Sequence, residues 1–92
     1  MLDFQRKDEQ MPLYLDIHNL DGVTADAVAD AHAKDLAEQD QHDVHYLRYW
    51  VDEDKGKVFC LVDAPTPEAA ADVHRTAHGL VADEIFEVSE GS

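Results

Sequence analysis

The chain has one cysteine, few basic residues and no long apolar run, and each shortage excludes a class of proteins. Cys60 is the single cysteine in 92 residues, so no disulfide can form within the chain and a reducing compartment is expected. No stretch approaches the roughly 18 apolar residues of a membrane span, and the N-terminus lacks the pattern of a signal peptide. These absences predict a cytoplasmic protein with one small domain.

Basic residues are also scarce, since 7 Lys and Arg stand against 21 Asp and Glu, a formal net charge of −14 with histidine neutral. Such a surface repels phosphate groups, so we expect no nucleic-acid partner and no membrane partner. The acids run along the whole chain, lysine is rare and Asp outnumbers Glu. This composition is typical of a halophilic protein, whose self-repulsion is screened by salt, although acidic proteins of low-salt organisms share it.

Hydrophobic periodicity divides the chain into a polar start and one patterned domain. Residues 1–10 are polar without periodicity, and we predict a disordered N-terminal arm followed by a single domain at 11–92. Turn and capping residues then delimit six elements. The predicted elements are a strand at 12–18, a helix from Thr24 to about Gln41, strands at 44–52 and 58–63, a helix from Thr66 to Gly79 and a strand at 84–88.

The order β-α-β-β-α-β predicts an α+β, ferredoxin-like fold, with a four-stranded antiparallel sheet and two helices on one face. Alternation splits the first strand into two faces, and we assign one of them, with part of the aromatic strand, to the sheet face that the helices leave open. The residues assigned to this open face are Tyr14, Asp16, His18, Tyr46, Arg48 and Trp50. A monomer would expose much of this surface, so we predict a homodimer in which a second copy covers it.

The first predicted helix has an apolar stripe that should pack on the sheet. The stripe comprises Ala25, Val28, Ala29, His32 and Leu36. His32 on this stripe is either a core histidine bonded to a carbonyl, or a ligand or base that faces a pocket beneath the sheet.

Six histidines are many for a chain with so few other basic groups. His74 and His78 stand four apart on the second predicted helix, which places both imidazoles on one face within reach of a single metal ion. The same spacing suits a pair at the edge of the core, and His78 also suits the negative end of the helix dipole. We interpret His42 and His45, which flank a loop, as surface residues.

Two further candidate sites lie on predicted strands. Asp16 and His18 share a strand face, and a carboxylate beside an imidazole suits Ni²⁺, Zn²⁺ or Co²⁺, although a solvated edge pair has the same pattern. Cys60 lies on a central strand, where it is either a small buried hydrophobe or, as a thiolate, a soft metal ligand. The chain has no nucleophile elbow, Gly-rich phosphate loop or paired-cysteine motif.

Several segments together resemble a known family over residues 12–88. The segments are PLYLDIH at 12–18, YLRYWVDED at 46–54, FCLVDAP at 59–65 and VHRTAHGLVADEI at 73–85. They resemble the small nickel-binding proteins that are also described as a domain of unknown function. The resemblance implies a ferredoxin-like fold, a homodimer and Ni²⁺ bound by histidine and oxygen ligands. The positions that fit the family's motif are Asp16, His18, His32, His74, His78 and, as a further candidate, Cys60.

Three functions remain open at this point. The first is a divalent-metal-binding protein, for nickel, that buffers or senses the ion. The second is a small dimeric enzyme with a histidine-lined pocket, in which His32 or His78 acts as a base and Tyr14 or Tyr46 assists. The third is an interaction module whose histidines are structural. Three convergent ligands would favour the first function, and a deep pocket without such ligands would favour the second.

Overall fold

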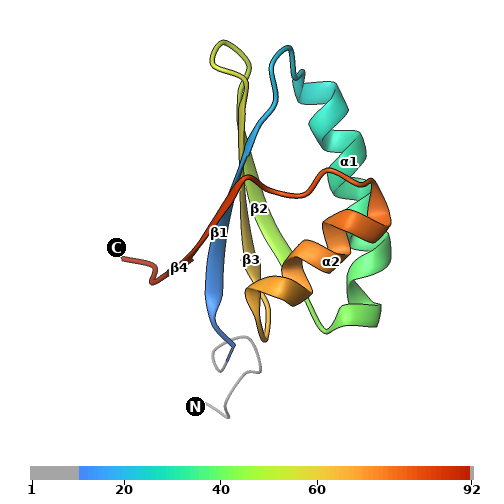
Figure 1. Ribbon diagram of the computed structural model, residues 1–92, viewed down its shortest axis with the longest axis vertical. Coiled ribbons are helices and arrows are strands. Elements are labelled where there is room, and N and C mark those ends of the chain that lie inside the picture. Colours follow the sequence, from blue (N-terminus) through green and yellow to red (C-terminus); the bar gives the residue numbers. More distant parts are fainter. Residues whose placement is uncertain (1–10, 92) are drawn as a thin grey trace.

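The computed structural model describes residues 11–91, which form one sheet with helices on one side (Figure 1). In chain order the elements are β1 (Leu13–Asn19), α1 (Ala25–Glu38), the short 3₁₀ helix η2 (Gln39–His42), β2 (His45–Asp52), β3 (Lys57–Asp63), α2 (Pro67–Ala77) and β4 (Glu84–Val88). The predicted order of strands and helices is confirmed. The arm predicted at residues 1–10 lies outside the described residues.

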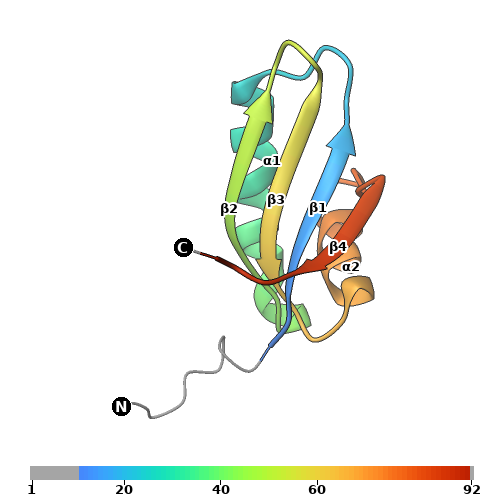
Figure 2. The same ribbon diagram turned by 90° about the vertical axis from the view of Figure 1, so that its left-hand side faces the viewer.

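The four strands are antiparallel and lie in the order β2-β3-β1-β4, so β1 and β3 are central (Figure 2). The pairing places Asp16 of β1 opposite Cys60 of β3. Both helices cover the same face of this sheet, and the opposite face is open in Figure 2. The predicted ferredoxin-like arrangement is therefore confirmed.

Side-chain caps begin both helices where the sequence predicts them. Thr24 Oγ1 accepts a hydrogen bond from the backbone of Ala27, and Thr66 Oγ1 accepts one from Ala69, each at 3.1 Å. These bonds satisfy backbone N–H groups that have no partner in the first helical turn. The caps fix the start of each helix and thereby which of its residues face the sheet.

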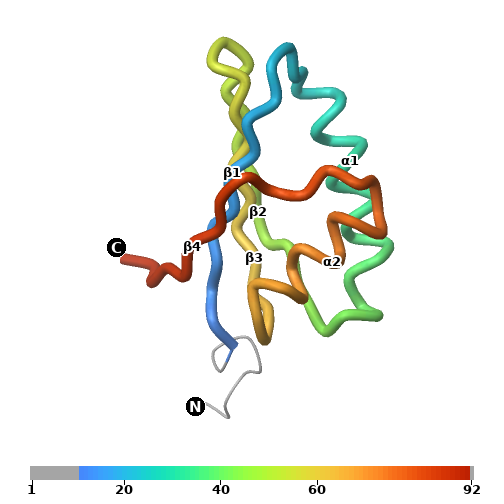
Figure 3. The backbone as a smooth tube through the Cα atoms, viewed as in Figure 1, coloured from blue at the N-terminus to red at the C-terminus, as the bar shows by residue number. Residues whose placement is uncertain are grey.

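Two turns at one end of the sheet contact each other (Figure 3). Gly56, in the β2–β3 turn, has φ +65° and its carbonyl accepts a hydrogen bond of 2.7 Å from the backbone of Leu20. A Cβ at Gly56 would lie 2.9 Å from the Leu20 carbonyl oxygen. The turn therefore needs glycine for its backbone angle and for the close approach of the β1–α1 loop.

The predicted orientation of β1 is wrong. Tyr14, Asp16 and His18 are buried beneath the helices, whereas Leu13, Leu15 and Ile17 alternate with them on the open face. The alternation of polar and apolar residues separates two faces without saying which is the core. Here the inner face carries polar groups that are bonded to the helices, and the apolar residues lie outside.

The aromatic strand β2 is divided by a bulge. Tyr46 is buried on the helix side, so its assignment to the open face is also wrong. A register irregularity follows between Tyr46 and Arg48, after which Arg48 and Trp50 pair with outward residues of β3. Arg48 and Trp50 therefore lie on the open face, as predicted.

Helix α1 is rotated relative to the predicted stripe. Val28 and Asp35 are its buried residues, while Leu36 is 44% exposed and Ala25 and Ala29 are exposed. Val28 and Asp35 stand seven residues apart, which is one helical face. The rotation has a physical reason, because it brings the Asp35 carboxylate to a histidine of α2.

The apolar core between sheet and helices is small. Its fully buried members are Val44, Val62, Ala64, Ala70 and Val73. The alanines let α2 approach the sheet closely. Among residues 11–91, no helix is long and apolar enough to cross a bilayer.

Replacing Gly56 by alanine is expected to destabilise the fold more than the same change at Gly22. Both glycines have positive φ, 65° and 79°, and alanine in this region is strained by about 1–2 kcal/mol. Gly56 adds the close contact with Leu20, whereas nothing lies within 4 Å of a Cβ at Gly22. Urea unfolding of both variants measures the difference in the free energy of unfolding. Equal losses would show that the close contact between Gly56 and Leu20 does not contribute to stability.

Candidate metal centre

Strands β1 and β3 provide one wall of a buried polar cluster. Asp16 and His18 stand two apart on β1, so both point toward the helices, and Cys60 lies beside Asp16 on β3. Their exposures are 1%, 4% and 6%. A carboxylate is almost never buried to this degree unless it is paired or hydrogen-bonded. The partners of Asp16 therefore define the cluster.

Helix α2 provides the opposite wall. Ala70 and Val73 pack into the core, and the following residue, His74, is 1% exposed. His78 is the C-cap of the same helix, one turn further on, and its ring centre lies 5.0 Å from that of His74. The His18 ring lies 4.9 Å from the His74 ring, so three imidazoles from two elements converge.

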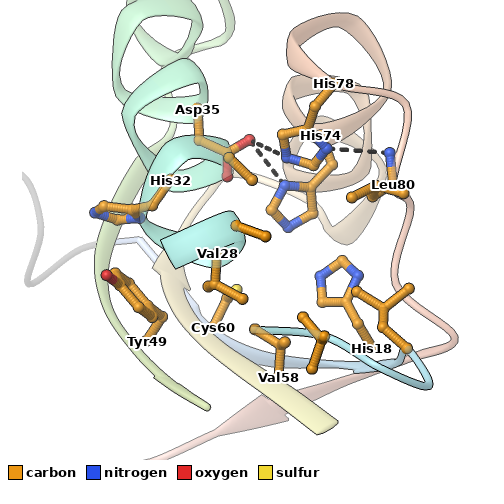
Figure 4. A pocket seen from close by; sticks show the side chains of 14 residues that line it. His18, Val28, His32, Asp35, Tyr49, Val58, Cys60, His74, His78 and Leu80 are labelled. Carbon is orange, nitrogen blue, oxygen red and sulfur yellow. Dashed lines mark hydrogen bonds and ion pairs between the residues drawn. The ribbon is translucent and has the colours of Figure 1, made fainter. Parts of the chain in front are cut away.

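His74 is held at both ring nitrogens by carboxylates from different elements. Its Nε2 lies 2.9 Å from Asp16 Oδ2 on β1, and its Nδ1 lies 2.9 Å from Asp35 Oδ1 on α1 (Figure 4). The Tyr46 hydroxyl lies 3.2 Å from Asp16 Oδ2 and 3.0 Å from the carbonyl oxygen of Ala70. The cluster thus connects β1, β2, α1 and α2.

The two carboxylates control the protonation of His74. Burial alone would lower the pKa of His74, but its hydrogen bonds to Asp16 and Asp35 outweigh burial and raise the pKa to about 9. Burial would likewise raise the pKa of Asp16, but its contacts with the His18 and His74 rings outweigh burial and lower the pKa to about 2. At neutral pH the centre is an imidazolium between two carboxylates.

Other groups of the cluster favour their neutral forms. Burial lowers the pKa of His78, against the opposing effect of the Asp35 carboxylate. Burial, followed by the charge of Asp16, raises the pKa of the Cys60 thiol well above its usual range. Burial also raises the pKa of Tyr46. At neutral pH His78 and Cys60 are therefore uncharged in the metal-free protein, and Cys60 must lose its proton before it can bind an ion as a thiolate.

Two polar atoms of the cluster are buried without a hydrogen bond. Asp16 Oδ1 lies 3.2 Å from His18 Nε2, and His78 Nε2 lies 2.9 Å from Asp35 Oδ1, but neither pair is aligned as a hydrogen bond. An unmade bond of this kind costs about 1–3 kcal/mol. Such atoms are typical of sites that receive another ligand.

Four donors lie close enough to hold one ion. Nitrogen, oxygen and sulfur atoms of Asp16, His18, Cys60 and His74 all lie within 4.8 Å of one another. Asp35, His74 and His78 form a second group by the same measure. Imidazole, carboxylate and thiolate together are donors that suit nickel, zinc, cobalt and copper. The buried His/Asp cluster is thus a possible metal-ligand set.

The structure brings together most of the sequence-predicted site residues and leaves His32 outside. Asp16, His18, Cys60, His74 and His78 belong to the two groups. His32 belongs to neither, and its ring packs on Tyr49 with centres 4.7 Å apart. His42 pairs with Glu38, and His45 pairs with the buried Asp63, so the loop histidines also lie outside both groups.

Asp35 is the residue that sequence reasoning missed. It contacts both histidines of α2 and is 3% exposed. The available signal was its spacing, since Asp35 follows Val28 by seven residues and shares its helical face. An acid on an apolar face is a sign of a buried partner.

A cavity of about 60 Å³ adjoins the cluster (Figure 4). One side of the cavity is lined by His18, Cys60 and His74, and another side is lined by His32 and Tyr49. Most of the remaining lining is apolar and comes from α1, β3 and the two loops near Leu20 and Leu80. The candidate ligands therefore border a small pocket that is partly open to the surface.

The pH dependence of stability tests the ion triad of Asp16, His74 and Asp35 in metal-free protein. The folded pKa of His74 lies above its ordinary 6.5, so the stabilisation is complete below about pH 6.5 and is lost as pH rises through about 9. Asp16 acts oppositely, and its contribution is lost as pH falls from about 3.8 through about 2. Asp35→Asn should lower the free energy of unfolding at pH 6 by about 1–3 kcal/mol and weaken the decline toward pH 9.

Asp30→Asn is the matched control, because Asp30 is exposed on the same helix and pairs with Lys34. Its pH profile should match that of the unchanged protein. Denaturant unfolding across the pH range with a chelator measures all three profiles. A flat profile between pH 6.5 and 9 for the unchanged protein would contradict the ion triad.

Comparisons with known proteins identify relatives of this chain. A family model described as nickel responsive proteins like SCO4226 matches residues 14–88. The crystal structure of SCO4226 from Streptomyces coelicolor A3(2) is similar with a TM-score of 0.81 and 37% identity, covering 87% of this chain and 99% of that chain. No curated protein sequence matches. The resemblance seen in the sequence is confirmed, and the chain belongs to the SCO4226-like family of nickel responsive proteins.

Proposed function

We propose that the protein binds one divalent transition-metal ion, nickel by preference, and buffers or senses it. The proposed ligands are Asp16, His18, Cys60 and His74. The observation that carries the proposal is the convergence of four buried donors from three elements around a carboxylate oxygen that has no hydrogen bond. Nickel, rather than another ion of this class, is favoured by the family to which the chain belongs.

The spacing of the donors supports the proposal. Ligand atoms about 2.0–2.1 Å from an ion lie about 2.9–3.4 Å from each other when the angle at the ion is 90–110°. Asp16 Oδ2 is 2.9 Å from His74 Nε2, and Asp16 Oδ1 is 3.2 Å from His18 Nε2. These donors therefore need only small movements to surround an ion.

The charge of the cluster also supports a divalent cation. Without metal, the carboxylates of Asp16 and Asp35 face one imidazolium, which leaves one uncompensated negative charge in a buried place. An ion that replaces the proton on His74 Nε2 brings two positive charges against two carboxylates. The bound state is then neutral while Cys60 remains a thiol, and ligation by its thiolate releases a further proton.

Asp35 and Tyr46 would support the ligands without touching the ion. Asp35 Oδ1 holds His74 Nδ1, the nitrogen opposite the proposed ligand atom. Metal-binding histidines usually have such a carboxylate or carbonyl partner, which fixes the tautomer and the ring. The Tyr46 hydroxyl holds Asp16 Oδ2 in the same way.

A small enzyme is the second candidate, and the cavity is the observation that favours it. His32 and His78 line this space as the enzyme hypothesis requires, but Tyr14 and Tyr46 do not belong to the lining. His78 makes contact with Asp35, and Tyr46 is engaged with Asp16 and Ala70. Convergent donors beside the cavity favour the metal site as the primary function.

We further propose that a second copy covers the open face of the sheet. Leu47, Trp50 and Phe86 on this face are 46%, 50% and 49% exposed. Outward residues of the central strands lie between them, among them Leu15 and Phe59. A broad apolar sheet face without a covering layer is typical of an interface between subunits.

Calorimetric titration of chelator-stripped protein tests the metal site. At pH 7.5 in high salt, which suppresses loose binding to the acidic surface, Ni²⁺ should bind saturably with one ion per chain. Lowering the pH to 5.5 should weaken binding by about a hundredfold, because His74 must release at least one proton. Equal affinity at both pH values would contradict histidine ligation.

Three variants locate the ligands. His74→Ala should abolish the saturable site, while His32→Ala, which changes another cavity histidine, should leave its affinity within about threefold. In protein loaded with Co²⁺, Cys60→Ser should remove the sulfur-to-metal charge-transfer absorption. A weak and salt-sensitive response in every variant would assign the binding to the acidic surface instead.

Light scattering tests the dimer. Trp50→Glu combined with Phe86→Glu should convert a dimer into a monomer, because two charges would be buried in an apolar interface. Leu36→Glu is the matched control, since Leu36 is exposed on α1 away from the sheet. A monomer before any substitution would exclude this interface.

A further inference from the structure

The pocket beside the proposed metal centre joins the buried ligands to the surface. Its lining includes the buried His18, Cys60 and His74 as well as Ala27 and Leu80, which are exposed. Two other hollows of the described surface, at the β2–β3 turn and on the open sheet face, border none of the proposed ligands. The pocket therefore gives an ion from solvent a path to these ligands that needs no opening of the core.

The pocket suits an ion that keeps part of its water shell. One water molecule needs about 10–15 Å³ of free space, and the pocket provides about 60 Å³. The net charge of −14 attracts cations to the surface around it. Imidazoles from β1, α1 and α2 line this space (Figure 4), so an ion that has left some of its waters meets nitrogen ligands along the way.

His32 differs from the other five histidines because it has no carboxylate partner. Each of the others lies within 3.2 Å of a carboxylate oxygen, and these five are His18, His42, His45, His74 and His78. The His32 ring instead packs on Tyr49, with planes inclined at 48°. Among residues 11–91, no hydrogen bond or ion pair holds either ring nitrogen of His32. This half-buried imidazole borders the pocket with its nitrogens unengaged.

The buried ligands, in contrast, are engaged before an ion arrives. Both ring nitrogens of His74 are bonded to carboxylates, and the Cys60 thiol has to lose its proton. Each of these groups must give up a bond or a proton before it can bind an ion. His32 has no such bond to break, so its imidazole can replace the first water of an incoming ion.

We propose that His32 is the entry ligand of the metal centre, which captures an incoming Ni²⁺ ion in the pocket and passes it to the buried ligands without belonging to the final site. Tyr49 holds the ring at the pocket wall. This inference rests on the metal function proposed above. Because His32 acts on the path and not on the bound state, its loss must slow loading and release by the same factor and leave the Kd unchanged.

Calorimetry and a release assay on the chelator-stripped full chain test the proposal. Titration with Ni²⁺ in high salt gives the Kd. Transfer of nickel from loaded protein to a coloured chelator, at concentrations where the rate no longer depends on the chelator, gives the rate constant of release. The ratio of the two gives the rate constant of association. His32→Ala should lower both rate constants about tenfold, the effect of losing one favourable contact in the entry step, and leave the Kd within about threefold.

Further variants separate the entry path from general effects. His32→Phe keeps a ring against Tyr49 without the nitrogens, and should slow both steps as His32→Ala does. His42→Ala removes a histidine outside the pocket, which pairs with Glu38, and should change neither step. Ala27→Leu narrows the exposed side of the pocket and should also slow both steps, whereas Ala33→Leu, exposed on the same helix outside the lining, should not.

Three results would overturn the entry role while the nickel site itself remains. Unchanged rate constants in both His32 variants would exclude a part in loading. A weaker Kd with faster release alone would make His32 a ligand of the final site. Unchanged rate constants in Ala27→Leu would place the path elsewhere. A protein that binds no nickel saturably would instead overturn the metal function and the entry role together.

Discussion

The bonds from His74 to Asp16 and Asp35 are the interaction on which this structure depends. They connect the central strand β1 to both helices, and all three side chains are nearly inaccessible to water. Breaking a buried pair by removing one partner typically costs about 3–5 kcal/mol, a large part of the 5–15 kcal/mol that stabilises a small domain. The position of α1 in particular follows from Asp35, because the exposed Leu36 next to it would otherwise be the natural core residue.

The same bonds place the candidate metal ligands at distances that would suit an ion, so the fold and the candidate site cannot be separated. A hydrogen bond between imidazole and carboxylate holds the two donors about as far apart as an ion would require. The proton of His74 thus occupies the place that the proposed ion would take. The proposed site would therefore be organised before an ion arrives, and loading it would need little rearrangement of the backbone. A variant at His74 should therefore change both the stability of the fold and the affinity for metal. The variants at Asp35 and His32 serve to distinguish these two effects.

The sequence predicted the elements and most members of the cluster because these depend on local chemistry. Threonine caps, Pro67 and the glycine turns act within a few residues, and the periods of helix and strand place His74 near His78 and Asp16 near His18. The orientation of β1 was predicted wrongly because an alternating pattern separates two faces without showing which one is buried. In this sheet the buried face carries hydrogen-bonded polar side chains and the open face carries apolar ones. Asp35 was missed because the stripe of α1 was chosen by hydrophobicity. Its burial is explained by its contacts with His78 and with His74, which is 39 residues away along the chain.

The polar interior gives a physical reason for the apolar exterior. A chain of 92 residues has a thin core, and here the middle of the inner face is occupied by Asp16 and His18 instead of large apolar residues. Those side chains are satisfied by bonds, but they contribute little to apolar burial. The leucines and aromatic residues of the open face can supply the missing burial only if something covers them, and in the proposed dimer the open faces of the two copies would cover each other. The proposed dimer would thus be a consequence of the buried cluster, because a sheet with a polar inner face must gain apolar burial on its outer face.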